Sequence, residues 1–172
     1  ILNVWFGGSE AGKAICDVIF GDKVPSAKLT TTFPQMIGQI PLYYNHLPPS
    51  HPDTDPEHFN IYRSNYIDVS NDPLYPFGYG LSYTTFAYGK PSLSSNELTM
   101  DGKITLSVDV TNTGNYDGTE IVQLYLRDPV ARIARPVKEL KGFRRLDLKK
   151  GETATVTFDI TPDMLKYYDA DL

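Results

Sequence analysis

Apolar and polar residues alternate along the second half of the chain, which is typical of β-strands that bury one face. Residues 104–110 read ITLSVDV, and residues 153–160 place four apolar side chains on one face. A lysine, glycine and glutamate cluster at residues 149–152 predicts a hairpin turn between the last two strands. We expect strands at residues 104–110, 119–127, 137–148 and 153–160, and a further strand that begins at Leu81. Short strands separated by turn-forming residues predict an immunoglobulin-like β-sandwich.

The opening of the chain has a different pattern. Residues 1–6, ILNVWF, are a nearly continuous apolar run, which suits a strand buried on both faces of a parallel sheet. A helical stripe of apolar side chains follows, with Ser9 as the expected N-cap and Gly21 just after the helix. Residues 27–33 predict a short strand, and residues 39–44 a further extended piece. Because a strand–helix–strand unit cannot cover its own apolar surface, we expect this segment to be the tail of a larger α/β domain.

Residues 71–86, NDPLYPFGYGLSYTTF, place aromatic rings among prolines and glycines. Such a segment makes a poor helix and is expected to be a stiff, irregular strip. One interpretation is a seam that packs its rings against neighbouring surfaces, and the other is a platform on which sugar rings stack. Since buried aromatic residues usually belong to a core, we favour the seam. If this is a seam, most of its rings should be largely buried and should touch both the helix region and the sandwich. The rings concerned are Tyr75, Phe77, Tyr79 and Phe86.

Composition and charge exclude several functions. The net charge of −5 offers no basic surface for nucleic acid, and no apolar run approaches the ~20 residues of a membrane helix. Cys16 is the single cysteine, so no internal disulfide can form. A proline-rich loop carries histidines and aspartates that resemble transition-metal ligands. These residues are His46, His51, Asp53, Asp55 and His58. The prolines favour an exposed linker instead, and we expect neither a metal nor a cofactor.

The sequence DPLYPFGYGLSYTTF resembles the point in glycoside hydrolase family 3 enzymes where the α/β sandwich domain gives way to a fibronectin type III-like domain. The stretches WFGGSEAGKAICDVIFGD, GQIPLYYNH and RPVKELKGF agree with this family in the same order. Within the family, the chain is most similar to bacterial periplasmic β-glucosidases. The resemblance is weakest over residues 47–65, where the family often has an arginine in place of Asn65.

The resemblance implies three parts. Residues 1–45 would be the C-terminal remnant of the α/β sandwich domain, residues 46–78 a linker and seam, and residues 79–172 a fibronectin type III-like domain that lacks its last strand or two. The overall expectation is a mainly β fold, in which a partial strand–helix–strand segment and a long irregular linker precede the sandwich. The exposed sheet edges of such a fragment would favour self-association.

The resemblance also implies a function. The parent protein would be a retaining, exo-acting β-glucosidase that releases terminal, non-reducing β-D-glucosyl residues and uses two carboxyl groups. Both groups would lie on the missing barrel and α/β portions, so we assign no catalytic residue here and expect the fragment to be inactive. Trp5 is the single substrate-binding candidate, because its turn lies toward the substrate side in the family.

The resemblance leaves alternatives for the function of the chain and implies partners for the parent protein. The chain could instead come from a β-xylosidase or another exo-glycosidase of the family, or act as an independent carbohydrate-binding or adhesion module. The expected partners of the parent are a β-glucoside or β-linked gluco-oligosaccharide and the missing domain portions, with no nucleic acid or membrane. The expected location is the periplasm of a bacterium or its exterior.

Overall fold

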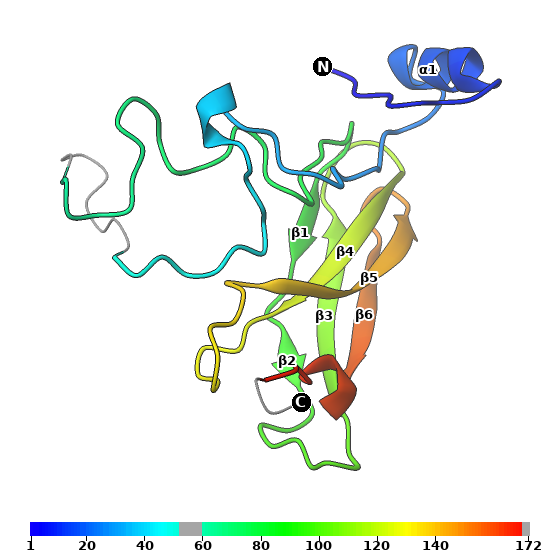
Figure 1. The fold of residues 1–172 in the computed structure, drawn as a ribbon. Coiled ribbons are helices and arrows are strands. Elements are labelled where there is room, and N and C mark those ends of the chain that lie inside the picture. The colour runs from blue at the N-terminus through cyan, green and yellow to red at the C-terminus, as the bar shows by residue number, and fades with distance from the viewer. Residues whose placement is uncertain (52–59, 170–172) are drawn as a thin grey trace.

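The computed structural model describes residues 1–51 and 60–169, in which an irregular N-terminal part lies against a β-sandwich (Figure 1). The helices are α1 (Ala11–Ile19) and the 3₁₀ turns η1 (Ile37–Gln39) and η2 (Pro162–Met164). The strands are β1 (Phe86–Tyr88), β2 (Ser92–Leu93), β3 (Ile104–Asn112), β4 (Gly118–Leu126), β5 (Glu139–Leu148) and β6 (Thr153–Ile160). The mainly β sandwich predicted from the alternating pattern is confirmed.

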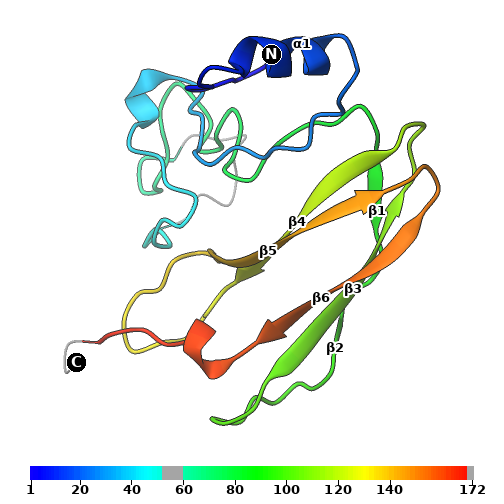
Figure 2. The ribbon, with the colours of Figure 1, turned by 90° about the vertical axis from the view of Figure 1, so that its right-hand side faces the viewer.

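Two sheets form the sandwich (Figure 2). In the larger sheet, β3 pairs antiparallel with β6 on one side and with β1 and β2 on the other. Phe86 pairs with Asn112 and Ser92 with Ser107, so β1 and β2 lie along the same edge of β3 as one interrupted strand. The expected strand from Leu81 was wrong, because strand pairing begins only at Phe86. The smaller sheet pairs β4 with β5.

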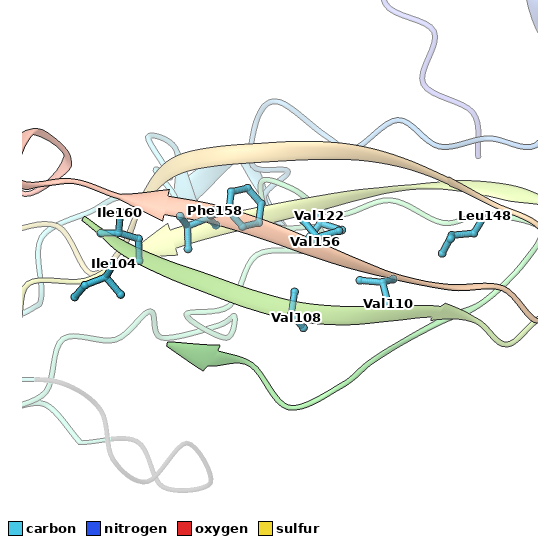
Figure 3. Close-up of a cluster of buried hydrophobic side chains, with 9 residues drawn as sticks. Ile104, Val108, Val110, Val122, Leu148, Val156, Phe158 and Ile160 are labelled. Atoms are coloured by element: carbon cyan, nitrogen blue, oxygen red, sulfur yellow. The ribbon is translucent and has the colours of Figure 1, made fainter. Parts of the chain in front are cut away.

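Alternate side chains of β3, β4 and β6 point between the two sheets and form the core (Figure 3). The buried members are Ile104, Val108, Val110, Val122, Leu124, Leu148, Val156, Phe158 and Ile160. The outer positions of β6 are exposed, as its alternation of threonine and aspartate with apolar residues requires. The period-two pattern in the sequence therefore identified the buried faces correctly.

The turn at residues 149–152 does not close a hairpin, and that prediction was wrong. It joins β5 to β6, which pair with β4 and β3 respectively and therefore belong to different sheets. Gly151 adopts φ = 77° there, and Glu152 donates its backbone N–H to the carbonyl of Lys149 at 3.0 Å. The turn itself is tight, but it carries the chain across the sandwich.

The N-terminal strands are absent from the described residues, so those predictions were also wrong. Residues 1–6 are irregular and exposed, because no neighbouring strand among the described residues supplies the hydrogen bonds that a parallel strand needs. Residues 27–33 run beside residues 75–79 with only one isolated β-bridge, between Phe33 and Tyr75. Residues 39–44 begin in a 3₁₀ turn and pass through a cis peptide before Pro41.

The helix predicted after residue 9 is confirmed, with one correction at its start. Glu10, not Ser9, occupies the N-cap position of α1 and makes no capping hydrogen bond through its side chain. Gly21 follows the C-terminus with φ = 85°, as predicted for a glycine that ends a helix. No residue of α1 is buried. Among the described residues, no helix has the length and hydrophobicity needed to span a membrane.

Candidate functional site

The aromatic strip, residues 71–86, and the loops beside it pack on the outer face of the smaller sheet and form a seam with it (Figure 2). Tyr44 stacks on Phe77 with ring centroids 4.1 Å apart, and its other contact is edge-on to Tyr125 of β4 at 6.0 Å. The Tyr44 hydroxyl accepts a hydrogen bond from the backbone N–H of Leu140 in β5 at 3.2 Å. One ring therefore connects the N-terminal segment, the strip and both strands of the sheet.

Gly78 lies at the closest approach of the strip to β4. Its φ of 81° falls in the left-handed region, which favours glycine. Its carbonyl accepts a hydrogen bond from Nε2 of Gln123 at 3.1 Å, and the Tyr125 hydroxyl donates to Oε1 of Gln123 at 2.5 Å. A Cβ at residue 78 would lie 2.4 Å from that Oε1, so the backbone conformation favours glycine and a larger residue would displace the Gln123 side chain.

The strip also connects the sandwich to the helix. The Tyr83 hydroxyl donates to the carbonyl of Val18 in α1 at 2.8 Å, while Tyr75 and Tyr79 stack at 5.1 Å. The strip therefore contacts both α1 and the β-sandwich, which supports its interpretation as a seam. The expectation that most of the four rings are largely buried is met in part, because Tyr75, Phe77 and Phe86 are partly buried whereas Tyr79 is 37% exposed.

A charged cluster closes the edge of the sandwich below the strip. Glu120 of β4 is buried, and its carboxylate accepts from the Lys28 ammonium at 3.2 Å and from the Tyr88 hydroxyl at 2.9 Å. Burial raises the pKa of Tyr88 well above its ordinary value, and the hydrogen bond and negative charge of Glu120 act in the same direction. Lys28 compensates the buried charge of Glu120, so this cluster stabilises the seam.

Two buried polar side chains organise the irregular segments, and sequence reasoning missed both. Gln39 is 1% exposed, and it accepts from the backbone N–H of Gln35 at 2.6 Å and donates to the carbonyl of Ser70 at 2.8 Å. Asn112 is fully buried between the two turns that cross from one sheet to the other. These turns are residues 113–117, between β3 and β4, and residues 149–152, between β5 and β6. Neither residue lies in an apolar pattern or a recognisable motif, so no local signal distinguished them.

Trp5 is the substrate-binding candidate from the sequence. It adopts φ = 45°, is 57% exposed, and faces Phe33 with ring centroids 6.3 Å apart. Its backbone N–H donates to the side chain of Asn3 at 3.4 Å. The ring therefore offers an accessible apolar face, which is a property that a sugar-stacking residue needs.

The histidine-rich loop is only partly described. His46 bonds the carbonyl of Leu47 through Nδ1 at 2.8 Å, and Nδ1 of His51 lies 3.1 Å from the Ser50 hydroxyl. The other three metal-ligand candidates, Asp53, Asp55 and His58, lie outside the described residues. Within residues 1–51 and 60–169, histidine, cysteine, aspartate and glutamate form no group of three or more that could hold a metal ion.

Comparison with known proteins identifies the class to which this architecture belongs. A model of the glycosyl hydrolase family 3 C-terminal domain matches residues 1–83, and a model of the fibronectin type III-like domain matches residues 120–172. The chain is 52% identical over 172 residues to a periplasmic β-glucosidase of Salmonella typhimurium, covering all of the chain and 22% of that protein. It is 45% identical to a β-xylosidase of Formosa agariphila, of which it covers 23%.

A solved structure supports the same assignment. The crystal structure of a β-glucosidase from Listeria innocua in complex with laminaribiose superposes with a TM-score of 0.91 at 43% identity, over 99% of this chain and 23% of that one. The chain thus belongs to glycosyl hydrolase family 3 and corresponds to its C-terminal part. It spans about a fifth of the length of the curated relatives that it matches.

Proposed function

We propose that this chain is the C-terminal part of a retaining, exo-acting β-glucosidase that hydrolyses terminal, non-reducing β-D-glucosyl residues of β-glucosides or β-linked gluco-oligosaccharides. The observation that carries the proposal is the 52% identity to a periplasmic β-glucosidase along the whole chain. That relative also supports a periplasmic or secreted location in a bacterium. The catalytic carboxyl groups lie on other parts of the polypeptide, and no metal or cofactor takes part.

In this proposal the chain acts as a scaffold divided near residues 45 and 78. The seam supports that role, because Tyr44 and Gly78 attach the N-terminal segment and the strip to the smaller sheet through ring contacts and hydrogen bonds. Such attachment holds the N-terminal segment at a fixed place relative to the sandwich. In the longer enzyme this attachment would hold Trp5 in place, with its exposed ring face toward the bound substrate.

Two alternatives are weaker. A β-xylosidase is supported by the 45% identity to the Formosa agariphila enzyme, which is lower than the identity to the β-glucosidase. An independent carbohydrate-binding module would be favoured by a coplanar row of exposed rings on the sandwich. Among the described residues, no pair of interacting rings joins two sandwich strands, and the exposed Phe143 and Tyr116 lie on separate elements.

Kinetics on the longer polypeptide that contains this chain test the proposal. We expect a higher kcat/KM for 4-nitrophenyl β-D-glucoside than for the β-D-xyloside, and no turnover of either by the 172-residue chain alone. Preference for the xyloside would support the β-xylosidase instead. Turnover by the purified chain, surviving removal of contaminating enzyme, would contradict the scaffold role.

The role of Trp5 has its own test in the longer polypeptide. Trp5→Ala should raise KM for the glucoside at least about fivefold, because a stacking surface is lost. Phe143→Ala is the matched control, since Phe143 is similarly exposed, at 62%, but lies on β5. Equal KM values for the two variants would show that Trp5 does not contribute to substrate binding.

Self-association of the isolated chain is also part of the proposal. The outer edge of β5 and the free edge of β6 have no strand partner among the described residues, and unpaired edges recruit other chains. Light scattering at increasing concentration should give a mass above that of one chain. A monomer at all concentrations would show that the edges are protected.

A further inference from the structure

The connection between β4 and β5 folds around a half-open cavity beside the start of the linker. Residues 127–137 and Pro48 line it, and its volume is about 380 Å³. Small-molecule sites in proteins begin at roughly 300 Å³, so this cavity can accommodate a ligand about the size of a monosaccharide. The site that we propose for it is independent of the glycosidase function proposed above.

The loop around the cavity is held at several points. The backbone N–H of Arg132 donates to the Tyr167 hydroxyl at 3.2 Å, and its guanidinium pairs with Asp169 at 3.2 Å. Near the other end, the N–H of Val137 donates to the carbonyl of His46 at 2.9 Å. Contacts from the chain on both sides therefore preform the cavity, which lowers the entropy lost on binding.

Positive charge is concentrated around this cavity. Arg127, Arg132 and Arg135 line it. Arg135 pairs with Glu139 at 2.8 Å, but Glu139 is shared with Lys141, whose ammonium lies 3.5 Å away.

Arg127 is the member of this set that is available for a ligand. It is exposed and makes no ion pair with any described residue. One carboxylate, that of Asp128, also belongs to the lining. Its Oδ1 accepts from the backbone N–H of Val130 at 3.2 Å, so it is turned toward its own loop. On a chain with a net charge of −5, an unpaired arginine at a preformed cavity is a specific attraction for an anion.

We propose that this cavity binds a sugar acid of monosaccharide size, with the carboxylate on Arg127 and the ring against the apolar side chains of Val130 and Ile133. The planar guanidinium fork matches a carboxylate with two parallel hydrogen bonds. Inorganic phosphate could also pair with Arg127, but it has no ring to pack against Val130 and Ile133. A neutral sugar would leave Arg127 without a counter-charge.

Titration of the chain with sodium glucuronate, followed by the backbone amide chemical shifts, tests the proposal. We expect the amides of the non-proline residues within 127–137 to shift and saturate, with much weaker responses to glucose and to inorganic phosphate at the same ionic strength. Arg127→Gln should weaken glucuronate binding about tenfold, which is the loss expected for one charge-assisted contact. Asp128→Asn keeps the oxygen that accepts from Val130 and removes the repelling charge, so it should tighten binding.

The control variant is Arg145→Gln, because Arg145 is 63% exposed on β5 and removing it changes the net charge equally away from the cavity. Its affinity should equal that of the unaltered chain. Absence of saturable shifts, equal binding of glucose or phosphate, or equal effects of the Arg127 and Arg145 variants would each overturn the proposal. Weaker binding by Asp128→Asn would overturn the placement of the carboxylate beside Asp128.

Discussion

Replacement of Asn112 by alanine tests whether one buried amide holds the two sheet-crossing turns together. The side chain is fully buried and makes four hydrogen bonds. Its Oδ1 accepts from Thr84 Oγ1 at 2.6 Å and from the Gly114 N–H at 3.1 Å, and its Nδ2 donates to the carbonyls of Tyr116 at 2.8 Å and Leu148 at 3.1 Å. The amide therefore connects the end of the strip, the turn after β3 and the end of β5.

The expected cost follows from the groups left without partners. The Thr84 and Leu148 contacts are buried, and each partner left unsatisfied costs about 1–3 kcal/mol. The Gly114 and Tyr116 contacts are only partly buried, so water replaces much of what is lost there. We expect Asn112→Ala to reduce the free energy of unfolding by about 3–5 kcal/mol, which is a large fraction of the total for a domain.

Urea unfolding followed by circular dichroism measures this difference. The matched control is Asn115→Ala in the same turn, because Asn115 is exposed and accepts only from the Lys150 ammonium at 3.1 Å. Its effect should stay within about 0.5 kcal/mol. A loss below about 1 kcal/mol for Asn112→Ala would refute the reasoning, since substitutions of surface residues cause losses of that size.

Three further predictions concern the seam and the titratable groups. Gly78→Ala should destabilise the chain by about 1–2 kcal/mol more than Gly151→Ala in urea unfolding. Both residues have positive φ, but only residue 78 accepts a hydrogen bond from Gln123 of β4, which an added Cβ would disturb. Equal losses would contradict the close approach. Burial, with the neighbouring carboxylate adding to it, raises the pKa of Tyr88 above 10.0, so its contribution to stability is full below pH 10.0 and is lost as pH rises through the raised pKa. Tyr88→Phe should therefore make the melting temperature fall less steeply as the pH rises above 10.0. An equally steep fall would contradict the role of Tyr88. The hydrogen bond from Lys103 lowers the pKa of Asp159 below 3.8, so the contribution of Asp159 to stability is present above pH 3.8 and is lost as pH falls through the lowered pKa. Asp159→Asn should therefore make the urea midpoint fall less steeply as the pH is lowered. An equally steep fall would show that this pair does not cause the acid sensitivity.

The sequence by itself determined the four long strands of the sandwich and the buried faces of β3 and β6. Alternation in β3 and β6 depends only on the two-residue period of a strand, which is a local property. The helix end at Gly21 was predictable for the same reason, because a left-handed residue after the last turn is a local requirement. The family relationship was also readable from the ordered stretches that resemble it.

Only the tertiary structure decided how these elements pair. The turn at residues 149–152 is tight whether its strands share a sheet or not, so its residues predicted a hairpin where the chain in fact crosses between sheets. The apolar run at residues 1–6 has the composition of a buried strand, but strand formation needs hydrogen-bond partners from distant segments. Asn112 and the loop cavity are invisible in the sequence, because each depends on backbone groups that only long-range packing brings together.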